Sequence, residues 1–395
     1  MKQMKLTSFI YIFSLSLILI FTGVELKAQD KKILPAADQP ELYLSKLSGK
    51  SVGIVANQTS ILTRSNQKHV VDFLLEKGIS VKKVFVPEHG FRGVADAGEK
   101  VDNTIDSKTG LPIISLYGNN KKPTAAQIKD LDLIIFDLQD VGVRFYTYIS
   151  TMHYVMEAAA ENGIPVMIFD RPNPNGDYIA GPVLKPGFES FVGMHPIPVV
   201  HGLTVGELAK MINGEKWLRG GLQATIEVVP VGNWTHDMRY NLPVKPSPNL
   251  PNDLSIRLYP SICFFEGTIV SLGRGTFFPF QTYGYPDPAF GNFTFTPISI
   301  DGMSKTPPLQ DQVCYGVDLR NEPLNQQFSL KYLLDAYQKS DKGKAFFSNY
   351  FNTLAGTDQL KKMILEGKTA LEIEASWQTD LDSYKKLREK YLIYE

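Results

Sequence analysis

Two glutamates stand where a carboxyl group could take part in acid–base chemistry. Glu88 follows a short apolar run and lies near Arg92 in the sequence. Glu266 follows Cys263-Phe264-Phe265 and precedes a glycine-rich stretch that contains Arg274. Glycoside hydrolysis needs one carboxylic acid to protonate the leaving oxygen and usually a second carboxylate as base or nucleophile. A partly buried glutamate can serve as that acid, but each of these two could instead form an ion pair with its nearby arginine.

Other charged side chains could share this chemistry or bind the substrate. The rival candidates for the second carboxylate are Asp137, Asp140 and Asp170. A guanidinium group binds a carboxylate through two hydrogen bonds, so an anionic substrate would suit the arginines Arg144, Arg171 and Arg274. The aspartates and arginines could equally form salt bridges with one another, and the sequence leaves both interpretations open.

Several cofactor and catalytic motifs are missing from the sequence. No G-x-G-x-x-G follows the first apolar run, and there is no P-loop, no H-E-x-x-H and no G-x-S-x-G. The side chains that could gather a metal have a spacing that matches no metal motif; they are His89, Asp137, Asp140, Asp170 and His201. We therefore expect neither a nucleotide cofactor nor a catalytic metal.

The first half of the chain alternates between short apolar runs and helical stretches. Strands are predicted at 51–56, 81–86, 112–117, 131–136 and 165–169, and helices at 69–77, 124–129 and 147–162. Short apolar runs are typical of strands covered on both faces, and their alternation with helices indicates a parallel sheet. A TIM barrel would need eight such units and only five are evident, so we predict an α/β fold with an open, doubly wound sheet.

Polar side chains follow all five predicted strands. Ligands of open parallel sheets bind beyond the carboxyl ends of the strands, so we expect these side chains to line one cleft. In chain order they are Asn57; Glu88, His89 and Arg92; Tyr117; Asp137, Gln139, Asp140, Arg144 and Tyr146; and Asp170, Arg171 and Asn173.

The pattern changes after a proline-rich segment at 242–251, where we place a domain boundary. Before it, a helix is predicted at 202–213, with Thr204 as N-cap and Glu207 at the capping-box spacing, and a strand at 223–229. After it, strands are predicted at 256–265, 268–272, 293–300 and 313–319, and helices at 330–339, 345–354, 358–366 and 379–390. We therefore predict a doubly wound domain at 29–245 and a smaller α+β domain at 246–395.

Composition and charge describe an ordered globular protein. The 395 residues are 43% hydrophobic and 21% charged, and 41 basic side chains balance 41 acidic ones. These figures exclude a disordered chain, a collagen and a coiled coil. Without an excess of basic residues there is no electrostatic case for nucleic-acid binding.

The N-terminus has the order of features found in a secretory signal peptide. Lys2 and Lys5 precede an apolar run at 6–24, and Ala28 follows as the small residue at the expected cleavage site. We expect removal of residues 1–28 and export to a periplasm or out of the cell. The alternative is an uncleaved membrane anchor, because the run is long enough to span a bilayer.

The two cysteines also bear on whether the protein is exported to an oxidising compartment. Cys263 and Cys314 could pair in an oxidising environment. A buried free thiol at Cys263 is at least as well supported, because its neighbours are apolar.

Several long motifs, taken in order, resemble the exo-β-N-acetylmuramidase family NamZ, glycoside hydrolase family 171, formerly a domain of unknown function. The matching segments are 87–93 (PEHGFRG), 137–148 (DLQDVGVRFYTY), 170–174 (DRPNP), 198–208 (PVVHGLTVGEL), 246–251 (PSPNLP) and 266–268 (EGT). The resemblance runs from about Ser51 to the end of the sequence. One departure is Val200 before His201, where the family pattern has Arg.

This resemblance implies a Rossmann-like catalytic N-terminal domain, a smaller auxiliary C-terminal domain and a cleft between them. It implies hydrolysis of β-1,4-linked N-acetylmuramic acid from the non-reducing ends of peptidoglycan fragments, without a cofactor. The expected partners are muramic acid oligosaccharides, with no nucleic acid and no membrane span after signal cleavage. An arginine would suit the lactyl carboxylate that distinguishes muramic acid from N-acetylglucosamine.

Roles for individual residues follow from the matched motifs. Glu88 carries over as the catalytic acid. Its partner is Glu266 by our own inference, with Asp137 or the acetamido group of the substrate as alternatives. The expected substrate-binding residues are Asn57, His89, Arg92, Gln139, Asp140, Arg144, Tyr146, Asp170, Arg171, Asn173, His201, Asn249 and Arg274. The alternative function is a non-catalytic protein that binds peptidoglycan fragments.

Overall fold

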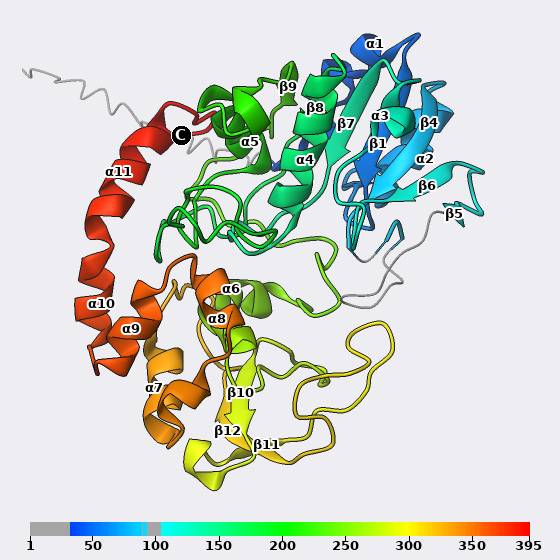
Figure 1. Cartoon of the computed structure of the whole chain (residues 1–395). Coiled ribbons are helices and arrows are strands. Elements are labelled where there is room, and N and C mark those ends of the chain that lie inside the picture. Colours follow the sequence, from blue (N-terminus) through cyan, green and yellow to red (C-terminus); the bar gives the residue numbers. More distant parts are fainter. Residues whose placement is uncertain (1–31, 89, 93–103) are drawn as a thin grey trace, which may run out of the picture. The chain divides into compact units, whose positions relative to one another are not determined.

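The structure is a computed structural model that describes residues 32–88, 90–92 and 104–395. A seven-stranded sheet organises its N-terminal half, residues 32–245 (Figure 1). The strands are β1 (Ser51–Ala56), β4 (Ser80–Val86), β5 (Thr104–Ile105), β6 (Pro112–Ser115), β7 (Leu133–Asp137), β8 (Val166–Phe169) and β9 (Ile226–Val229). The predicted signal peptide at 1–28 lies outside the described residues.

The order of the strands is that of a Rossmann sheet. The sheet runs β5-β6-β4-β1-β7-β8-β9, and every neighbouring pair except β5 and β6 is parallel. Counted along the chain, the six parallel strands have the order 3-2-1-4-5-6. The predicted doubly wound, mostly parallel sheet is therefore confirmed.

Both faces of this sheet are covered. Ile54 of β1 packs into a hydrophobic cluster with residues of α1 and α2, whereas the next residue, Val55, packs into a cluster with residues of α4 and α5. The helices of this half are α1 (Leu44–Leu47), α2 (Val70–Glu76), α3 (Ala125–Ile128), α4 (Tyr148–Glu161) and α5 (Val205–Gly214), with the 3-10 helices η1 (Ala36–Asp38), η2 (Pro40–Leu42) and η3 (Arg219–Gly221). A small hairpin joins β2 (Ile61–Leu62) to β3 (Lys68–His69). Burial on two sides explains why the strand sequences are apolar rather than alternating.

The predicted start of α5 is confirmed by its hydrogen bonds. The Thr204 side chain accepts from the backbone N–H of Glu207 at 3.2 Å, and the Glu207 carboxylate accepts from the backbone N–H of Thr204 at 2.9 Å. Two N–H groups at the helix start, which have no acceptor within the helix, are thereby satisfied.

The C-terminal half, residues 246–395, combines a small sheet with helices. The antiparallel sheet has the order β10-β12-β11, with β10 (Thr282–Tyr285), β11 (Phe293–Phe295) and β12 (Cys314–Asp318). The helices are α6 (Asp253–Ile262), α7 (Lys331–Lys339), α8 (Tyr350–Ala355), α9 (Gln359–Leu365), α10 (Ala370–Ser376) and α11 (Gln378–Glu389), with 3-10 helices η4 (Cys263–Gly267), η5 (Pro288–Phe290) and η6 (Gly343–Phe346). The predicted smaller α+β part is confirmed, whereas the boundary at 245/246 stays a prediction.

Three predicted elements of this half were wrong. The strand expected at 256–265 is helix α6 followed by η4, and α6 begins with a capping box between Asn252 and Ser255. Pro260 lies inside α6 and cannot donate to the carbonyl of Ile256, which instead accepts from the Asn175 Nδ2 at 3.2 Å. The strand expected at 268–272 makes only isolated bridges, and the helix expected at 345–354 is divided between η6 and α8.

The two halves share one hydrophobic core. The Phe145 ring from the N-terminal half lies 5.3 Å from the Tyr259 ring and 5.8 Å from the Phe264 ring. Helix α11 returns beside the N-terminal half (Figure 1), where the Tyr384 hydroxyl donates to the carbonyl of His201 at 2.7 Å. Residues Ile33–Glu395 accordingly form one compact unit.

The predictions for residues 1–28 concern a segment outside the described residues, but the state of the cysteines can be compared with the structure. Cys263 and Cys314 are both buried free thiols and do not form a disulfide bond with each other. Within the described ranges, no helix is long and apolar enough to cross a bilayer.

Candidate active site

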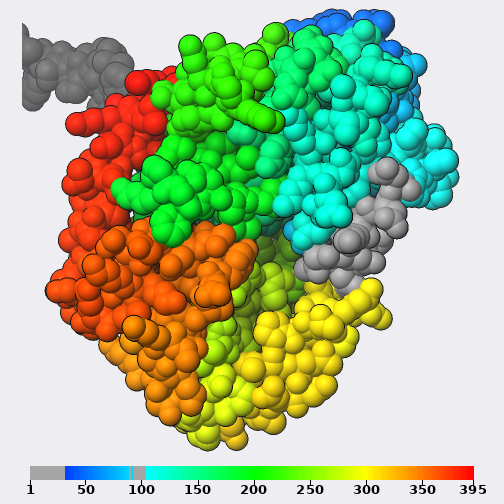
Figure 2. Space-filling model, in the orientation of Figure 1, coloured from blue at the N-terminus to red at the C-terminus, as the bar shows by residue number. Residues whose placement is uncertain are grey.

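A pocket with two adjoining chambers lies where the halves meet. On the face drawn in Figure 2, the surface is hollowed between loops of the N-terminal half, the helices that follow β12 and the loop before β12. The outer chamber, of about 580 Å³, is lined by Thr268, Leu272, Ser304, Lys305, Thr306 and Pro308, among others. The inner chamber, of about 250 Å³, is lined by Tyr117, Tyr146, Thr147, Tyr148, Asn249 and Tyr259, among others. Glu88, Glu266, Arg274 and Tyr350 line both chambers.

Glu88 reaches this pocket from the carboxyl end of β4. Its Oε1 accepts a hydrogen bond of 3.2 Å from the Tyr117 hydroxyl, and Tyr117 follows β6, the neighbour of β4 in the sheet. Burial, together with the Glu88 carboxylate, raises the pKa of Tyr117 to about 12. The phenol therefore keeps its proton at neutral pH and donates a hydrogen bond to Glu88.

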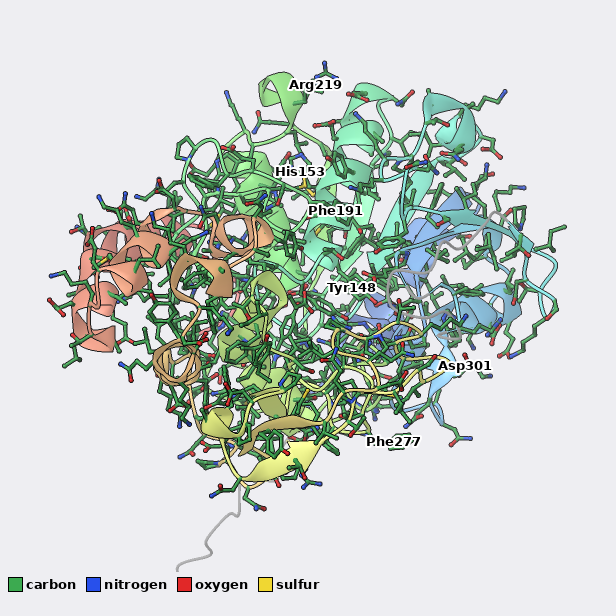
Figure 3. The ribbon with its side chains drawn as sticks, turned by 60° about the horizontal axis from the view of Figure 1, so that its bottom comes forward. Tyr148, His153, Phe191, Arg219, Phe277 and Asp301 are labelled. Atoms are coloured by element: carbon green, nitrogen blue, oxygen red, sulfur yellow. The ribbon has the colours of Figure 1, made fainter. Side chains whose placement is uncertain are left out.

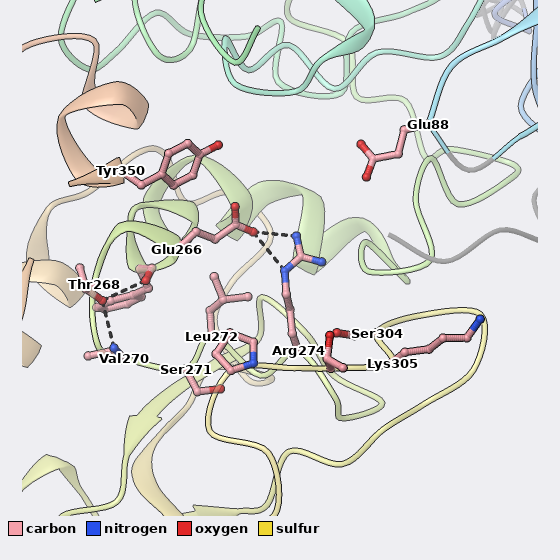
Figure 4. A pocket seen from close by; sticks show the side chains of 13 residues that line it. Glu88, Glu266, Thr268, Val270, Ser271, Leu272, Arg274, Ser304, Lys305 and Tyr350 are labelled. Atoms are coloured by element: carbon pink, nitrogen blue, oxygen red, sulfur yellow. Dashed lines mark hydrogen bonds and ion pairs between the residues drawn. The ribbon is translucent and has the colours of Figure 1, made fainter. Parts of the chain in front are cut away.

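Glu266 reaches the same pocket from η4 in the C-terminal half. Its Oε1 accepts from Arg274 Nη2 at 2.6 Å and from Arg274 Nε at 3.1 Å (Figure 4). Burial alone would lower the pKa of Arg274, but the adjacent carboxylate outweighs it and the pKa is raised. The other oxygen, Oε2, has no hydrogen-bond partner among the described residues and turns away from the guanidinium group in Figure 4.

A glycine allows Glu266 and Tyr350 to lie close together. A Cβ atom on Gly267 would lie 2.5 Å from the Cα of Phe351, closer than two such atoms can approach. Because residue 267 is glycine, the first turn of α8 can pack directly on η4. This contact brings Tyr350, the first residue of α8, to the rim of the chamber that Glu266 lines.

Two tyrosines fix the wall of the inner chamber. The hydroxyls of Tyr146 and Tyr148 donate to the carbonyl of Pro246 at 2.8 and 3.3 Å. Tyr148, labelled in Figure 3, also accepts from the Asn57 Nδ2 at 2.8 Å. The predicted residue Asn57 therefore lies behind Tyr148 and positions it. The proline-rich segment that follows Pro246 supplies Asn249, whose Nδ2 donates to the carbonyl of Met303 at 2.8 Å.

The predicted carboxylate Asp137 lies away from both chambers. It is fully buried, and its two oxygens accept from Arg171 Nε at 2.6 Å and Arg171 Nη2 at 3.0 Å. Both residues thus form the salt bridge that was the alternative to a functional role. This placement favours Glu266 over Asp137 as the second carboxylate of the pocket.

Several other predicted residues hold loops together at the carboxyl edge of the sheet. Gln139 Nε2 donates to the carbonyl of Pro172, and Asn173 Nδ2 donates to the carbonyl of Leu203. Asp170 accepts from the Tyr394 hydroxyl at 2.6 Å, and burial raises its pKa to about 6. None of these three side chains is among the described residues that line the two chambers.

Asp140 and His201 form a second buried polar group outside the chambers. Asp140 Oδ2 accepts from the backbone N–H of Gly142 at 2.6 Å and lies 4.0 Å from His201 Nε2. Burial raises the pKa of Asp140 to about 7 and lowers that of His201 to about 3. The neighbouring Val200 is also buried and pairs through its backbone with Val143 and Ala180, so residue 200 faces the core rather than the pocket.

Arg144 is a structural residue that joins the two halves. It is 0% exposed, and its guanidinium group donates to four carbonyls. Nη1 donates to the carbonyls of Pro182 and Ile197 at 2.7 and 2.8 Å. Nη2 donates to the carbonyls of Leu354 and Ala355 at 3.1 and 2.7 Å. The latter two are the last carbonyls of α8, the helix that begins with Tyr350.

The remaining predicted residues near Glu88 have two different outcomes. Arg92 forms ion pairs with Asp106 at 2.8 Å and with Asp72 at 3.4 Å, away from the chambers. His89 lies outside the described residues. No group of three or more His, Cys, Asp or Glu side chains within the described ranges could hold a metal ion.

Sequence reasoning missed part of the pocket wall. Tyr148 ends the matched segment 137–148 but received no role, and Tyr259 lies in a stretch that the sequence predicted as a strand. Tyr350 and the segment 304–308 carry no motif, and their place in the pocket depends on tertiary packing. Tyr117 was recognised at a strand end, and in the structure it lines the inner chamber and donates a hydrogen bond to Glu88.

The chain is similar to known proteins over most of its length. A family model described as "Exo-beta-N-acetylmuramidase NamZ, N-terminal" matches residues 52–254, and its C-terminal counterpart matches residues 257–394. The "Peptidoglycan beta-N-acetylmuramidase NamZ" of Bacillus subtilis (strain 168) is 40% identical over 375 residues, which are 89% of this chain and 89% of that protein.

Two solved structures are similar over nearly the whole described chain. Both are DUF1343 family proteins from Bacteroides fragilis NCTC 9343. The first has a TM-score of 0.85 at 46% identity, and the second a TM-score of 0.79 at 28% identity. Each comparison covers 92% of this chain and 99% of the other. Matches to both family models, together with the 40% identity to the Bacillus subtilis protein, show that the chain belongs to the NamZ family of exo-β-N-acetylmuramidases.

Proposed function

We propose that this protein is an exo-acting glycoside hydrolase that releases N-acetylmuramic acid from the non-reducing ends of peptidoglycan fragments, in cell-wall recycling or scavenging. The observation that carries the proposal is the meeting of Glu88 and Glu266, from opposite halves of the chain, in one pocket. Glycosidases use such a pair of carboxyl groups on either side of the scissile bond.

The two carboxyl groups take different roles. Glu266 accepts two hydrogen bonds from the Arg274 guanidinium group and is the second carboxylate of the pair. Glu88 stands at the position of the catalytic acid in the matched segment 87–93, and the Tyr117 hydroxyl donates a hydrogen bond to it. Glu88 donates a proton to the glycosidic oxygen as the bond to the anomeric carbon breaks. Glu266 attacks that carbon directly or removes a proton from the water that attacks it.

The proposal is tested with two disaccharides and the purified protein. The first is N-acetylmuramic acid β-1,4-linked to N-acetylglucosamine, and the second has the two sugars in reverse order. Release of muramic acid from the first alone is the expected result. If neither is cleaved but the first still binds in calorimetry, the protein is a binder of peptidoglycan fragments rather than an enzyme.

Substitution of the carboxylates tests the roles. Glu88→Gln should lower kcat by about 10²–10⁴-fold, because general acid catalysis contributes about that factor, and should preserve binding of the disaccharide. Unchanged turnover would remove Glu88 from the mechanism. Glu266→Gln should also lower kcat; if it does not, the acetamido group of the substrate takes the role of Glu266.

Export forms a separate part of the proposal. The charged, apolar and small residues at 1–28 support removal of a signal peptide and release into a periplasm or the medium. N-terminal sequencing of the protein from cell fractions should find a chain that begins at Gln29. A cytoplasmic chain that begins at Met1 would contradict export.

A further inference from the structure

Two buried histidines are hydrogen-bonded to each other outside the pocket. His153 Nδ1 lies 3.0 Å from His195 Nε2, and the two residues are 6% and 1% exposed. Neither lines the two chambers, and the proposed mechanism gives them no role. Burial of a polar ring costs free energy unless the ring is hydrogen-bonded, and here each ring is the partner of the other.

The histidine pair joins helix α4 to a turn that forms part of the pocket wall. His153 lies on α4, whereas His195 follows the turn 190–193. Two backbone hydrogen bonds, of 2.9 and 3.0 Å, join the first and last residues of this turn. Phe191 and Val192 lie between those residues and line the inner chamber. The pair is therefore two residues away from a turn that shapes the pocket.

Two further contacts with α4 hold the same turn. The Ser150 hydroxyl donates to the carbonyl of Phe191 at 2.7 Å, and the Tyr154 ring stacks on the Phe191 ring at 6.3 Å and an angle of 14°. Ser150, His153 and Tyr154 are spaced by three and four residues, so they lie on one side of the helix. Helix α4 begins with Tyr148, which also lines the inner chamber, and Phe191 lies between His153 and Tyr148 in Figure 3.

One assignment of protons satisfies the histidine pair. Glu157 Oε2 lies 3.6 Å from His153 Nε2, so a proton on that nitrogen faces a carboxylate. His153 Nδ1 is then an acceptor, and His195 Nε2–H donates to it. His195 Nδ1 carries no proton; it is buried and has no hydrogen-bond partner among the described residues. Both rings are neutral in this arrangement, and both ring N–H groups face an acceptor.

An added proton disrupts this arrangement. If His153 becomes an imidazolium, its Nδ1–H meets the Nε2–H of His195, and the two donors repel each other. The clash is relieved only if the His195 proton moves to Nδ1, where a buried N–H group would lack an acceptor among the described residues. Either outcome weakens the contact between α4 and the turn.

The charges beside His153 come from three segments of the chain. Glu157 accepts from Lys122 Nζ at 2.6 Å and from the backbone N–H of Arg219 at 2.8 Å, and Lys122 also pairs with Glu161 at 2.7 Å. Burial lowers the pKa of His153, and Lys122 adds to this effect, whereas the Glu157 carboxylate opposes it without reversing it.

The surroundings of His195 disfavour a proton as well. Its ring stacks on the Trp217 ring at 5.5 Å. Burial, together with His153 and His201, lowers the pKa of His195 well below its usual range. The pair is therefore neutral at neutral pH and takes up a proton only as the pH falls below about 6.

We propose that His153 and His195 are positioning residues, whose hydrogen bond holds the turn 190–193 against α4 and thereby keeps Phe191 and Val192 in the pocket wall. The bond forms only while both rings are neutral, so acid loosens this part of the wall. The consequence for hydrolysis rests on the proposed function, whereas the state of the turn does not depend on it.

Two substitutions of His195 separate the hydrogen bond from the bulk of the ring. His195→Phe keeps an aromatic ring beside Trp217 but has no donor for His153. His195→Gln keeps a donor, because its amide nitrogen lies about as far along the side chain as the imidazole Nε2. The glutamine does not titrate, and by turning its amide it can present an oxygen to a protonated His153.

At pH 7, His195→Phe should raise KM for the muramic acid–glucosamine disaccharide by about three- to tenfold, the range that corresponds to loss of one hydrogen bond. Its kcat should stay within about twofold of wild type, because Phe191 and Val192 bind substrate without taking part in the chemistry. His195→Gln should restore the wild-type KM. Between pH 7 and pH 5, KM should rise for the wild type but not for His195→Gln, whereas the carboxyl groups of the pocket titrate in both.

A folded His195→Phe variant with the wild-type KM would overturn the proposal, as would a glutamine variant whose KM rises in acid like that of the wild type. A variant that only unfolds more easily would lose active protein and lower the apparent kcat without changing KM. Thermal unfolding shows whether His195→Phe is folded.

Hydrogen–deuterium exchange of the segment 189–197 tests the positioning without turnover. After correction for the intrinsic rate, exchange should become faster between pH 7 and pH 5 in the wild type and stay constant in His195→Gln. The same change in both proteins, or no change in either, would contradict the proposal even if His195→Phe does not fold. Failure of the wild-type protein to cleave the disaccharide would contradict the proposed function and leave the exchange result valid.

Discussion

Each of the two carboxyl groups of the pocket accepts a hydrogen bond from a neighbouring side chain. Glu266 accepts two hydrogen bonds from Arg274, and both fall on a single oxygen. Glu88 accepts from the uncharged Tyr117 hydroxyl. Hydrogen bonds from a charged donor are about twice as strong as those from a neutral one, so the two bonds from Arg274 hold the Glu266 carboxylate firmly in place.

Removing the Tyr117 hydroxyl tests this arrangement. Tyr117→Phe should lower kcat by up to about tenfold, because a neutral hydrogen bond contributes about 0.5–1.5 kcal/mol, and should leave KM almost unchanged. Steady-state kinetics on the disaccharide measures both constants. Tyr154→Phe, on the outer part of α4, is the control and should change neither. A rise in KM with normal kcat would mean that Tyr117 binds the ground-state substrate instead.

Two buried aspartates should make opposite contributions to stability as pH changes. Burial raises the pKa of Asp140 to about 7, so its charged form costs stability, and this cost grows as pH rises from about 4 to about 7. The hydrogen bonds from Arg92 lower the pKa of Asp106 to about 2, so the ion pair stabilises the protein above about pH 4 and is lost as pH falls toward 2.

Asparagine variants measure these two effects by urea unfolding between pH 3 and pH 8. Asp140→Asn should become more stable relative to wild type as pH rises, by on the order of a few kcal/mol at pH 8. Asp106→Asn should be less stable than wild type at pH 7 and lose much of that deficit near pH 3. If the two variants show the same dependence on pH, burial and pairing do not control these carboxyl groups as described.

At the scale of secondary structure, helix α8 is held at both ends. Its first turn packs on η4 through Gly267, and its last carbonyls accept from the buried Arg144. A cation at a helix C-terminus also interacts favourably with the helix dipole. These contacts fix Tyr350 relative to Glu266, so the shape of the pocket depends on a helix that contributes only one lining residue.

Arg144→Lys should destabilise the protein although the charge is kept. A lysine ammonium has three donors and cannot bond all four carbonyls, so at least one hydrogen bond is lost at a cost of about 0.5–1.5 kcal/mol. Urea unfolding measures the loss. Arg219→Lys, at the exposed position labelled in Figure 3, is the control and should lie within about 0.5 kcal/mol of wild type.

The sequence predicted the sheet better than the site. Buried parallel strands produce short apolar runs, and all five in the first part of the chain were found at nearly their observed positions. Helix α6 was missed because its apolar residues and Pro260 resemble the sequence of a strand. The carbonyl of Ile256 accepts a hydrogen bond from the side chain of Asn175, which lies far away in the sequence. Local patterns cannot reveal such a distant partner.

The same limit applies to charged side chains. Sequence reasoning brought together Glu88, Glu266 and Arg274, but it could not separate these from Asp137, Arg171 and Arg144. Each set contains carboxylates and guanidinium groups, and all six residues stand after predicted strands or in loops. Only packing decides whether a charged group faces a cavity or is enclosed by carbonyls and an opposite charge.

At the scale of the whole molecule, the two halves should unfold together. Phe145, Tyr259 and Phe264 join them in one hydrophobic core, and Arg144 and α11 add polar contacts across the boundary. If one half unfolded alone, the hydrophobic core that the two halves share would be exposed to water. We expect one calorimetric transition with equal calorimetric and van't Hoff enthalpies. Two resolved transitions would show that the family's two-part description is also a division into independent folding units.

The contact of Tyr394 with Asp170 has a consequence for the order in which the protein is made. The two residues are 224 positions apart, yet Asp170 lies at the carboxyl edge of the first sheet and is fully buried. A chain emerging from the ribosome offers this carboxylate no phenol partner until nearly all of the second half has been synthesised. The N-terminal half therefore stays incompletely packed during synthesis, and its native packing can be completed only late in translation or after it.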